Sequence, residues 1–316
     1  MAKTFYLLFM LSLAVIFLAA YLLNVADYLY VPFENRNFTS SFYSNLIHYA
    51  NTSYPLLFSN IRWNHMPLKV YIDLESAAGL IRFSQEDVND FRTAMINWED
   101  ETDGTISFIE TGDEENADIT IEWARRLDDV GSIKTVGEGG PVVVNTGLFN
   151  LTVAGKITLV PGDASCKNVN IGMHELGHVL GLDHTDDPED VMYPFESCSV
   201  KISAVAIQTI KELYEVQPNP DLLFVNATAT RSGAIVNLET VIKNQGILNS
   251  TNTSILLKVD DTEIEGIPLR PIPPGGSLIF RQAFRIYKKF DIMTLAIDPD
   301  GLIEELDKSN NQITLS

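Results

Sequence analysis

The sequence reads HELGHVLGLDH at residues 174–184, and this stretch decides the fold expected of the whole chain. Residues four apart on a helix lie on the same face, so His174 and His178 can direct two imidazoles at one metal ion. Glu175 lies next to that face and can reach a water on the metal without being a ligand itself. The stretch therefore predicts a helix that carries a metal centre.

The third ligand has to approach the metal from another direction, because a straight helix cannot complete a tetrahedral site from its next turn. Gly181 can adopt the positive φ that ends a helix, after which the chain folds back and presents His184. The neighbouring Asp183 is an alternative ligand, but the offset of His184 fits better. Three of the chain's five histidines lie within these eleven residues, which disfavours a mere packing role. We expect His174, His178 and His184 to bind one Zn²⁺ and to leave a fourth position open for water.

The stretch resembles the extended zinc-binding signature of the metzincin metalloproteases, and DVMYP at residues 190–194 resembles their Met-turn. Val-Met-Tyr-Pro, with Thr185 after the last histidine, is most similar to the matrixin branch. The resemblance implies an α+β zincin fold over residues 67–216, with a mixed twisted sheet and three helices. It also implies that Met192 packs beneath the zinc, whereas Tyr193 either packs or assists the oxyanion.

A zinc endopeptidase is the function that this resemblance implies, with proteins or peptides as substrates. Zinc lowers the pKa of its water to about 7, and Glu175 is expected to act as general base and to return the proton to the leaving amine. A surface adhesion or binding protein with a purely structural zinc is the alternative from another class. The glutamate and the open fourth position argue against it. A zinc enzyme for another amide or a glycan-linked substrate ranks below both.

Two further features lie near the zinc stretch. Cys166 and Cys198 are the only cysteines, and a disulfide between them would close a loop of about 33 residues around the site, worth about 3–4 kcal/mol. We expect this disulfide to link the active-site helix to the Met-turn; Cys166 as a zinc ligand is the weaker alternative. The acidic run at residues 186–190 is either a solvated turn or a Ca²⁺ site. The thiol latency and the second histidine-rich zinc site of animal matrixins are missing, because residues 27–66 lack cysteine and only His48 and His65 remain.

The N-terminus indicates export. Residues 4–26 carry no charge and residues 5–23 are almost wholly apolar, which is about the length of a membrane-spanning helix. Residues 1–26 are therefore expected to be a transmembrane anchor with the rest of the chain outside the cell, or a cleaved signal that leaves the protein secreted. Residues 27–66 are expected to be a stalk, a short propeptide-like segment or an irregular lead-in strand.

Charge and sequons bear on the partners and the location of the chain. It has 22 basic and 42 acidic residues, a net charge of −20, which disfavours nucleic acid as a partner. Six Asn-x-Ser/Thr sequons follow the export segment and suggest a surface glycoprotein; they begin at Asn37, Asn51, Asn150, Asn226, Asn249 and Asn252.

Local patterns place further elements before and after the zinc helix. Ser84 and Asp87 form a capping-box pattern, and apolar residues at helical spacing predict a helix over about 85–101. Ser203 is the expected N-cap of the last helix. The glycine-rich residues 137–141 are predicted to interrupt the chain. Strands are predicted at residues 68–73, 106–109, 117–123, 142–144 and 156–160.

The texture changes after the linker at residues 217–220. Short alternating runs, separated by turns at roughly 8–12-residue spacing, predict a β-sandwich over residues 221–316. Its ordered motifs, which include VIKNQG, PPGGS and a terminal IDPDGLIEELDKSNN, resemble the CARDB domains of prokaryotic surface proteins. The resemblance implies an immunoglobulin-like sandwich that makes cell-surface or glycan contacts rather than performing catalysis.

Overall fold

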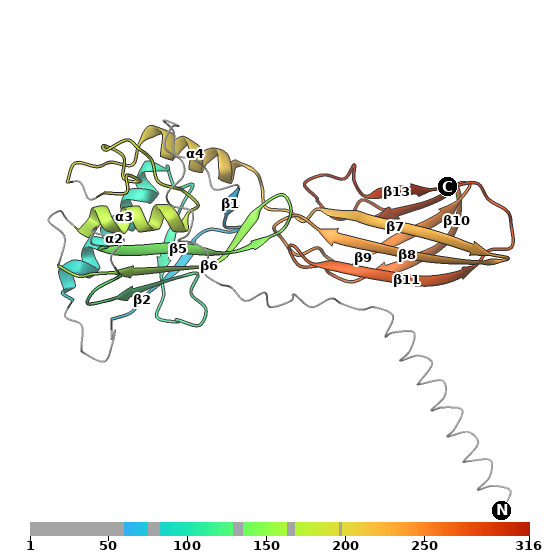
Figure 1. The fold of residues 1–316 in the computed structure, drawn as a ribbon, viewed down its shortest axis with the longest axis horizontal. Helices are drawn as coiled ribbons and strands as arrows, with labels where there is room; N and C mark the ends of the chain where they lie inside the picture. The colour runs from blue at the N-terminus through green and yellow to red at the C-terminus, as the bar shows by residue number, and fades with distance from the viewer. Residues whose placement is uncertain (1–59, 75–82, 129–134, 163–167, 196–197) are drawn as a thin grey trace, which may run out of the picture. The chain divides into compact units, whose positions relative to one another are not determined.

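The computed structural model of the chain describes residues 60–74, 83–128, 135–162, 168–195 and 198–316. They divide into a unit that ends at Pro218 and a unit that begins at Asn219 (Figure 1). The predicted anchor at residues 1–26 lies outside the described residues. In the described ranges, no helix is both long enough and apolar enough to cross a membrane.

The first unit contains one mixed sheet with helices packed against it, as the sequence predicts. Its order is β3-β2-β4-β6, with β5 on the far side of β6 and β1 also paired with β6. Every pair is parallel except β5–β6, which is antiparallel. The elements are β1 (Ile61–Arg62), β2 (Leu68–Ile72), α2 (Gln85–Glu101), β3 (Phe108–Glu110), β4 (Ile119–Trp123), β5 (Gly137–Asn145), β6 (Asn150–Leu159), α3 (Asn168–Val179) and α4 (Ala204–Glu215).

Two of the helices begin at the caps that the sequence predicts. The Ser84 hydroxyl accepts the Asp87 backbone N–H, and the Asp87 carboxylate accepts the Ser84 backbone N–H, so the capping box is complete. The Ser203 hydroxyl accepts the N–H of Ala206 at the start of α4. Both predicted caps are confirmed.

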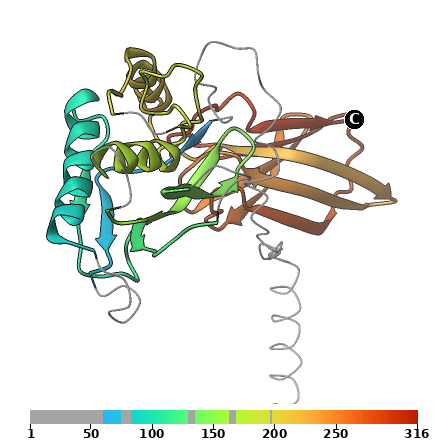
Figure 2. The same ribbon diagram turned by 60° about the vertical axis from the view of Figure 1, so that its left-hand side comes forward.

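Helix α3, which carries His174 and His178, packs against α2 and over β5 and β6 (Figure 2). Trp98 of α2 is fully buried, and its indole N–H donates to the Met173 carbonyl of α3 at 2.9 Å. Gly172 meets α2 as well, because a Cβ there would lie 3.1 Å from that of Ala94. The two helices are therefore closely packed against each other.

The prediction that residues 137–141 interrupt the chain is wrong, because they form the first half of β5. Glycine is usually unfavourable in a strand, since it packs no side chain. Here the absence of side chains lets β5 approach α3 closely, which a local reading of the sequence could not anticipate.

The second unit is a sandwich of two antiparallel sheets, which confirms the predicted immunoglobulin-like fold. One sheet has the order β10-β9-β12-β13 and the other β11-β8-β7. Apolar side chains from both sheets form one buried cluster between them. The strands are β7 (Leu222–Ser232), β8 (Ile235–Asn244), β9 (Thr253–Val259), β10 (Thr262–Leu269), β11 (Ser277–Arg285), β12 (Met293–Ile297) and β13 (Gln312–Leu315).

Candidate metal centre

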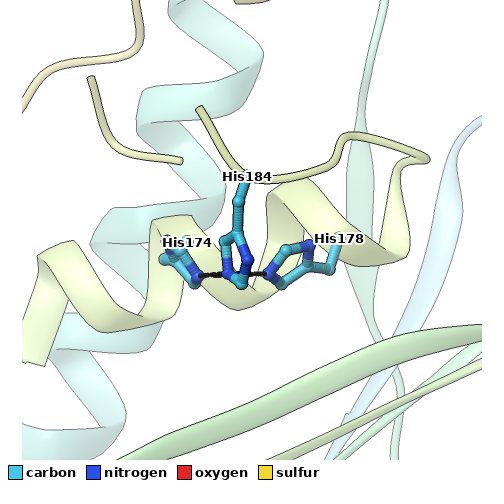
Figure 3. Close-up of side chains that lie close together, drawn as sticks. All are labelled: His174, His178 and His184. Atoms are coloured by element: carbon cyan, nitrogen blue, oxygen red, sulfur yellow. Dashed lines mark hydrogen bonds between the residues drawn. The ribbon is translucent and has the colours of Figure 1, made fainter. Parts of the chain in front are cut away.

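Three imidazoles converge at one point of the first unit (Figure 3). The Nε2 atom of His174 lies 3.1 Å from that of His178 and 3.2 Å from that of His184. The third separation, between His178 and His184, is also 3.2 Å. Across the described ranges, this is the only group of three or more histidine, cysteine, aspartate or glutamate side chains close enough together to hold a metal ion.

The end of α3 brings His184 to the other two. The helix closes with a Schellman motif, in which Leu182 N–H donates to Gly177 O and Gly181 N–H to His178 O. Gly181 has φ +104°, as the sequence predicts, and a Cβ there would overlap the carbonyl of Ile61 in β1. The turn therefore requires glycine both for its backbone conformation and for its contact with β1.

Hydrogen bonds to the backbone orient two of the rings. His174 Nδ1 lies 2.7 Å from the Val191 carbonyl, and His178 Nδ1 lies 2.9 Å from the Leu182 carbonyl. A carbonyl only accepts, so each Nδ1 carries the ring proton and each Nε2 presents a lone pair.

This donor set fits a zinc ion. Facing lone pairs cannot hydrogen-bond to each other, so a cation is the partner that satisfies them. Tetrahedral zinc with Zn–N distances of about 2.0–2.1 Å separates its nitrogen ligands by about 3.3–3.4 Å. The observed separations of 3.1 and 3.2 Å are close to that value.

The environment keeps the three histidines neutral, which is the form that binds metal. Burial, and then the neighbouring His178, lower the pKa of His174 to about 3. Burial is also the first cause for His178 and His184, whose pKa values fall to about 4. Protons therefore compete only weakly for these ligands.

Glu175 lies next to the ligand His174 in α3 and faces the backbone of β5. Its side chain is 5% exposed, and Gly139 donates a backbone N–H to it. A Cβ at Gly137 would lie 2.5 Å from Glu175 Oε1, and one at Gly139 2.9 Å from Oε2. Burial, and then the charge of Glu138, raise the pKa of Glu175 to about 8. Because neither glycine has a side chain, the backbone of β5 lies directly against the Glu175 carboxylate.

Met192 packs against α3, the helix that carries His174 and His178. It is fully buried, and a Cβ on Gly177 of α3 would overlap its sulfur. The turn is held by Thr185 N–H donating to Met192 O at 3.0 Å and by Met192 N–H donating to Asp190 Oδ1 at 2.7 Å. The same turn supplies the Val191 carbonyl that orients His174, so it also holds the ligand set in place.

The remaining predicted residues lie around the centre in other roles. Asp183 is not in the ligand group; its carboxylate accepts the His184 backbone N–H at 2.6 Å. The ring of Tyr193 contacts that of Phe195. Cys198 is disulfide-bonded, and Cys166, the only other cysteine of the sequence, lies outside the described residues.

The acidic run at residues 186–190 and His65, a histidine outside the triad, form local contacts. Asp187 accepts the Glu189 backbone N–H at 3.0 Å, and Glu189 pairs with Lys201 at 3.7 Å. His65 pairs with Asp118 at 3.1 Å, away from the triad.

Sequence reasoning missed the parts of the site that the backbone supplies. The carbonyls of Val191 and Leu182 left no signal, because every residue carries a carbonyl. Gly137 and Gly139 did leave one, since glycines two apart in a strand lie on the same face and suggest close approach by another group.

Comparisons with known proteins agree with this geometry. Residues 62–215 match the matrixin family and residues 219–315 match the CARDB family. Karilysin of Tannerella forsythia is 28% identical over 149 residues, which cover 42% of this chain and 29% of karilysin. Rat (Rattus norvegicus) stromelysin-2 is 29% identical over 145 residues, with the same two coverages. This chain thus spans under a third of the length of either relative.

Among solved structures, the CARDB domain of a Pyrococcus furiosus protein is 16% identical, with a TM-score of 0.27. The match covers 31% of this chain and 85% of that domain. Taken with the sheet order, the histidine triad and the Met-turn, the family matches establish that this chain carries a matrixin domain followed by a CARDB domain.

Proposed function

We propose that the chain is a zinc-dependent endopeptidase that acts outside the cytoplasm. The convergence of three Nε2 atoms within 3.2 Å of one another, beside a buried glutamate, is the observation that carries this proposal. The matrixin family and relatives named karilysin, matrilysin and stromelysin-2 support it.

His174, His178 and His184 would hold the zinc. When bound by three protein ligands, zinc supplies Lewis acidity that polarises a carbonyl and activates water. Glu175 accepts a proton at its carboxylate and delivers it to the nitrogen of the leaving amine. The Gly139 N–H orients that carboxylate. The backbone of β5 lies against the carboxylate and excludes water from the side that it covers.

Tyr193 has two proposed roles, packing and assistance to the oxyanion. Its ring contact with Phe195 at a centroid distance of 5.5 Å favours packing. The Tyr193→Phe variant distinguishes the two roles. If Tyr193 only packs, kcat is retained; if its hydroxyl donates to the oxyanion, kcat falls about 10²–10³-fold.

Export is supported by the uncharged N-terminal segment and by the disulfide-bonded Cys198, since disulfides persist in oxidising compartments. We propose that residues 1–26 anchor the chain to the membrane or are removed on secretion. The CARDB unit would contact the cell surface or its glycans. N-terminal sequencing of the mature protein and fractionation of producing cells test these points.

The decisive experiment compares Glu175→Ala with wild type. We expect the variant to retain one zinc per chain by metal analysis. Its activity on a peptide library should fall about 10²–10⁴-fold, because only the general base is removed. A chelator should abolish wild-type activity, and added zinc should restore it. Full activity of the zinc-loaded variant would reject the proposal.

A further inference from the structure

The Asn-x-Ser/Thr sequons take no part in the protease chemistry, and the folded chain exposes them to different extents. Four of them lie in the described ranges, at Asn150, Asn226, Asn249 and Asn252. We propose that the folded chain is N-glycosylated at Asn249, and that the other three described sequons are poor acceptors once the protein has folded. The modification rests on the proposed export, but the exposure that permits it does not.

Asn249 lies in the loop at residues 245–252, between β8 and β9, outside any strand. Asn249 and the hydroxyl residue of its sequon, Thr251, are both exposed. An enzyme that glycosylates asparagine has to enclose both side chains, so both must be accessible. In the described part of the chain, no hydrogen bond occupies either side chain. The sequon is therefore available as it stands.

The residues on either side of Asn249 fix the loop to the sandwich. Ser250 is 3% exposed; its N–H donates to Ile272 O at 3.1 Å and its Oγ accepts Ile272 N–H at 2.9 Å. The Leu248 carbonyl accepts Nδ2 of the buried Asn244 at 2.7 Å. With Leu248 and Ser250 bonded to the sandwich, the side chain of Asn249 points toward solvent. A sugar attached there needs no rearrangement of the core.

Asn150 is in the opposite situation. It begins β6, pairs with Ile61 of β1 on one side and with Asn145 of β5 on the other, and its Oδ1 accepts Asn145 Nδ2 at 2.9 Å. Thr152, which carries the hydroxyl of this sequon, is only 2% exposed. Recognition would require β6 to leave the sheet.

The other two sequons are limited by strand pairing. Asn226 and Thr228 are exposed but belong to β7, whose backbone is paired with β8 on both sides of a bulge. The sequon of Asn252 ends at Ser254, which lies in β9 and is paired with Pro268 of β10. The Ser254 carbonyl also accepts Asp298 N–H at 3.0 Å. A glycan on Asn249 would also obstruct Asn252, three residues further on.

The reaction requires a lipid-linked oligosaccharide as the co-reactant. A bond forms between Nδ2 of Asn249 and the first sugar carbon, and the bond from that carbon to the lipid phosphate oxygen breaks. The amide nitrogen loses one proton, and the lipid phosphate leaves with the bonding electron pair. The sequon hydroxyl of Thr251 remains unmodified.

Glycosylation of the already folded protein tests the proposal directly. The full-length chain, produced in a host without N-glycosylation, is incubated with a single-subunit oligosaccharyltransferase and a lipid-linked oligosaccharide, and glycopeptides are mapped by mass spectrometry. Among the four described sequons, we expect a glycan at Asn249 alone. Asn249→Gln and Thr251→Val should reduce it at least tenfold, whereas Thr251→Ser should retain it. Asn150→Gln and Asn252→Gln are matched controls that should leave the yield unchanged.

The same chain, reduced and unfolded, provides the reference for accessibility. We expect it to be modified at Asn150 and Asn226 as well as at Asn249, because no strand pairing then protects them. Modification of folded Asn150 to the same extent as Asn249 would overturn the proposal. So would an unmodified Asn249 in the folded chain under conditions that modify it in the unfolded one. Neither result depends on the protease activity.

Discussion

Replacing Gly139 by alanine is expected to slow catalysis while the zinc stays bound. A Cβ at this position would lie 2.9 Å from both Oε2 and Cβ of Glu175, and 3.0 Å from its carbonyl oxygen. Ordinary contacts of a Cβ begin at 3.4 Å, so β5 and α3 would have to separate or the carboxylate would have to turn. Both responses weaken the hydrogen bond from the Gly139 N–H to Glu175.

The magnitude follows from the size of the overlap. An added methyl in a closely packed contact costs about 1–3 kcal/mol of stability. A general base contributes about 10²–10⁴ to the rate when well placed, and we expect its displacement to lose part of this, about 10–100-fold in kcat. Such a loss equals about 1.4–2.8 kcal/mol in activation free energy. The ligand rings are not among the atoms nearest to the added methyl, so zinc content should remain at one ion per chain.

The assay measures kcat and KM on a quenched fluorescent peptide, zinc content and melting temperature for the same preparation. Gly112→Ala is the matched control, because a Cβ there meets nothing within 4 Å. Gly137→Ala should be more severe than Gly139→Ala, since its Cβ would lie 2.5 Å from Glu175 Oε1 and 2.7 Å from Ile171. A folded, zinc-loaded Gly139→Ala variant with wild-type kcat would refute the idea that β5 positions Glu175.

Three further predictions concern stability. Arg62 is 2% exposed and donates to the Leu213 and Val216 carbonyls at 2.8 Å. Arg62→Met should therefore lower the unfolding free energy by about 3 kcal/mol and Tm by about 6–12 °C. Arg92→Met, at an ion pair on the surface, is the control. Metal-free protein should lose stability as pH falls from about 6.5 toward 4, because the unfolded chain binds protons at its histidines first, and their folded pKa values lie near 3 to 4. The raised pKa of Glu175, about 8, adds stability as pH falls toward 4.5, but the three imidazoles together outweigh this one carboxyl. Equal melting temperatures at pH 7 and pH 5 would contradict the predicted loss of stability. Reduction, or Cys198→Ser, should lower the unfolding free energy by about 3–4 kcal/mol, and the absence of any change would argue against a disulfide that closes the zinc segment.

Local signals explain what the sequence could predict. Ser84 is the N-cap of α2 because the capping box is complete within four residues. Helix α3 is closed by the turn at Gly181 because that turn needs a positive φ. The ligand spacing is equally local. These features depend on neighbours in the chain, so the sequence pattern contains them in full.

Features that depend on distant partners could not be read in the same way. The pairing of β2 with both β3 and β4, and of β6 with β1, is decided by which apolar strands meet in the core. Nothing within LKVYI at residues 68–72 specifies its neighbours. The alternation predicted that strands exist here, and only the folded sheet gives their order.

The glycines of β5 show how these two kinds of information combine. Judged by propensity alone, residues 137–141 interrupt the chain between strands, and that prediction was wrong because they belong to β5. Yet the glycines that weaken the strand locally are needed where it crosses Glu175, because any side chain at Gly137 or Gly139 would occupy the space of the carboxylate. A local preference was therefore overruled at the residues that contact the proposed general base. Such a conflict between propensity and fold is expected where function constrains the backbone. On the same reasoning, a Gly-x-Gly pair in the edge strand of another zincin should be examined first for contact with the glutamate of its zinc helix.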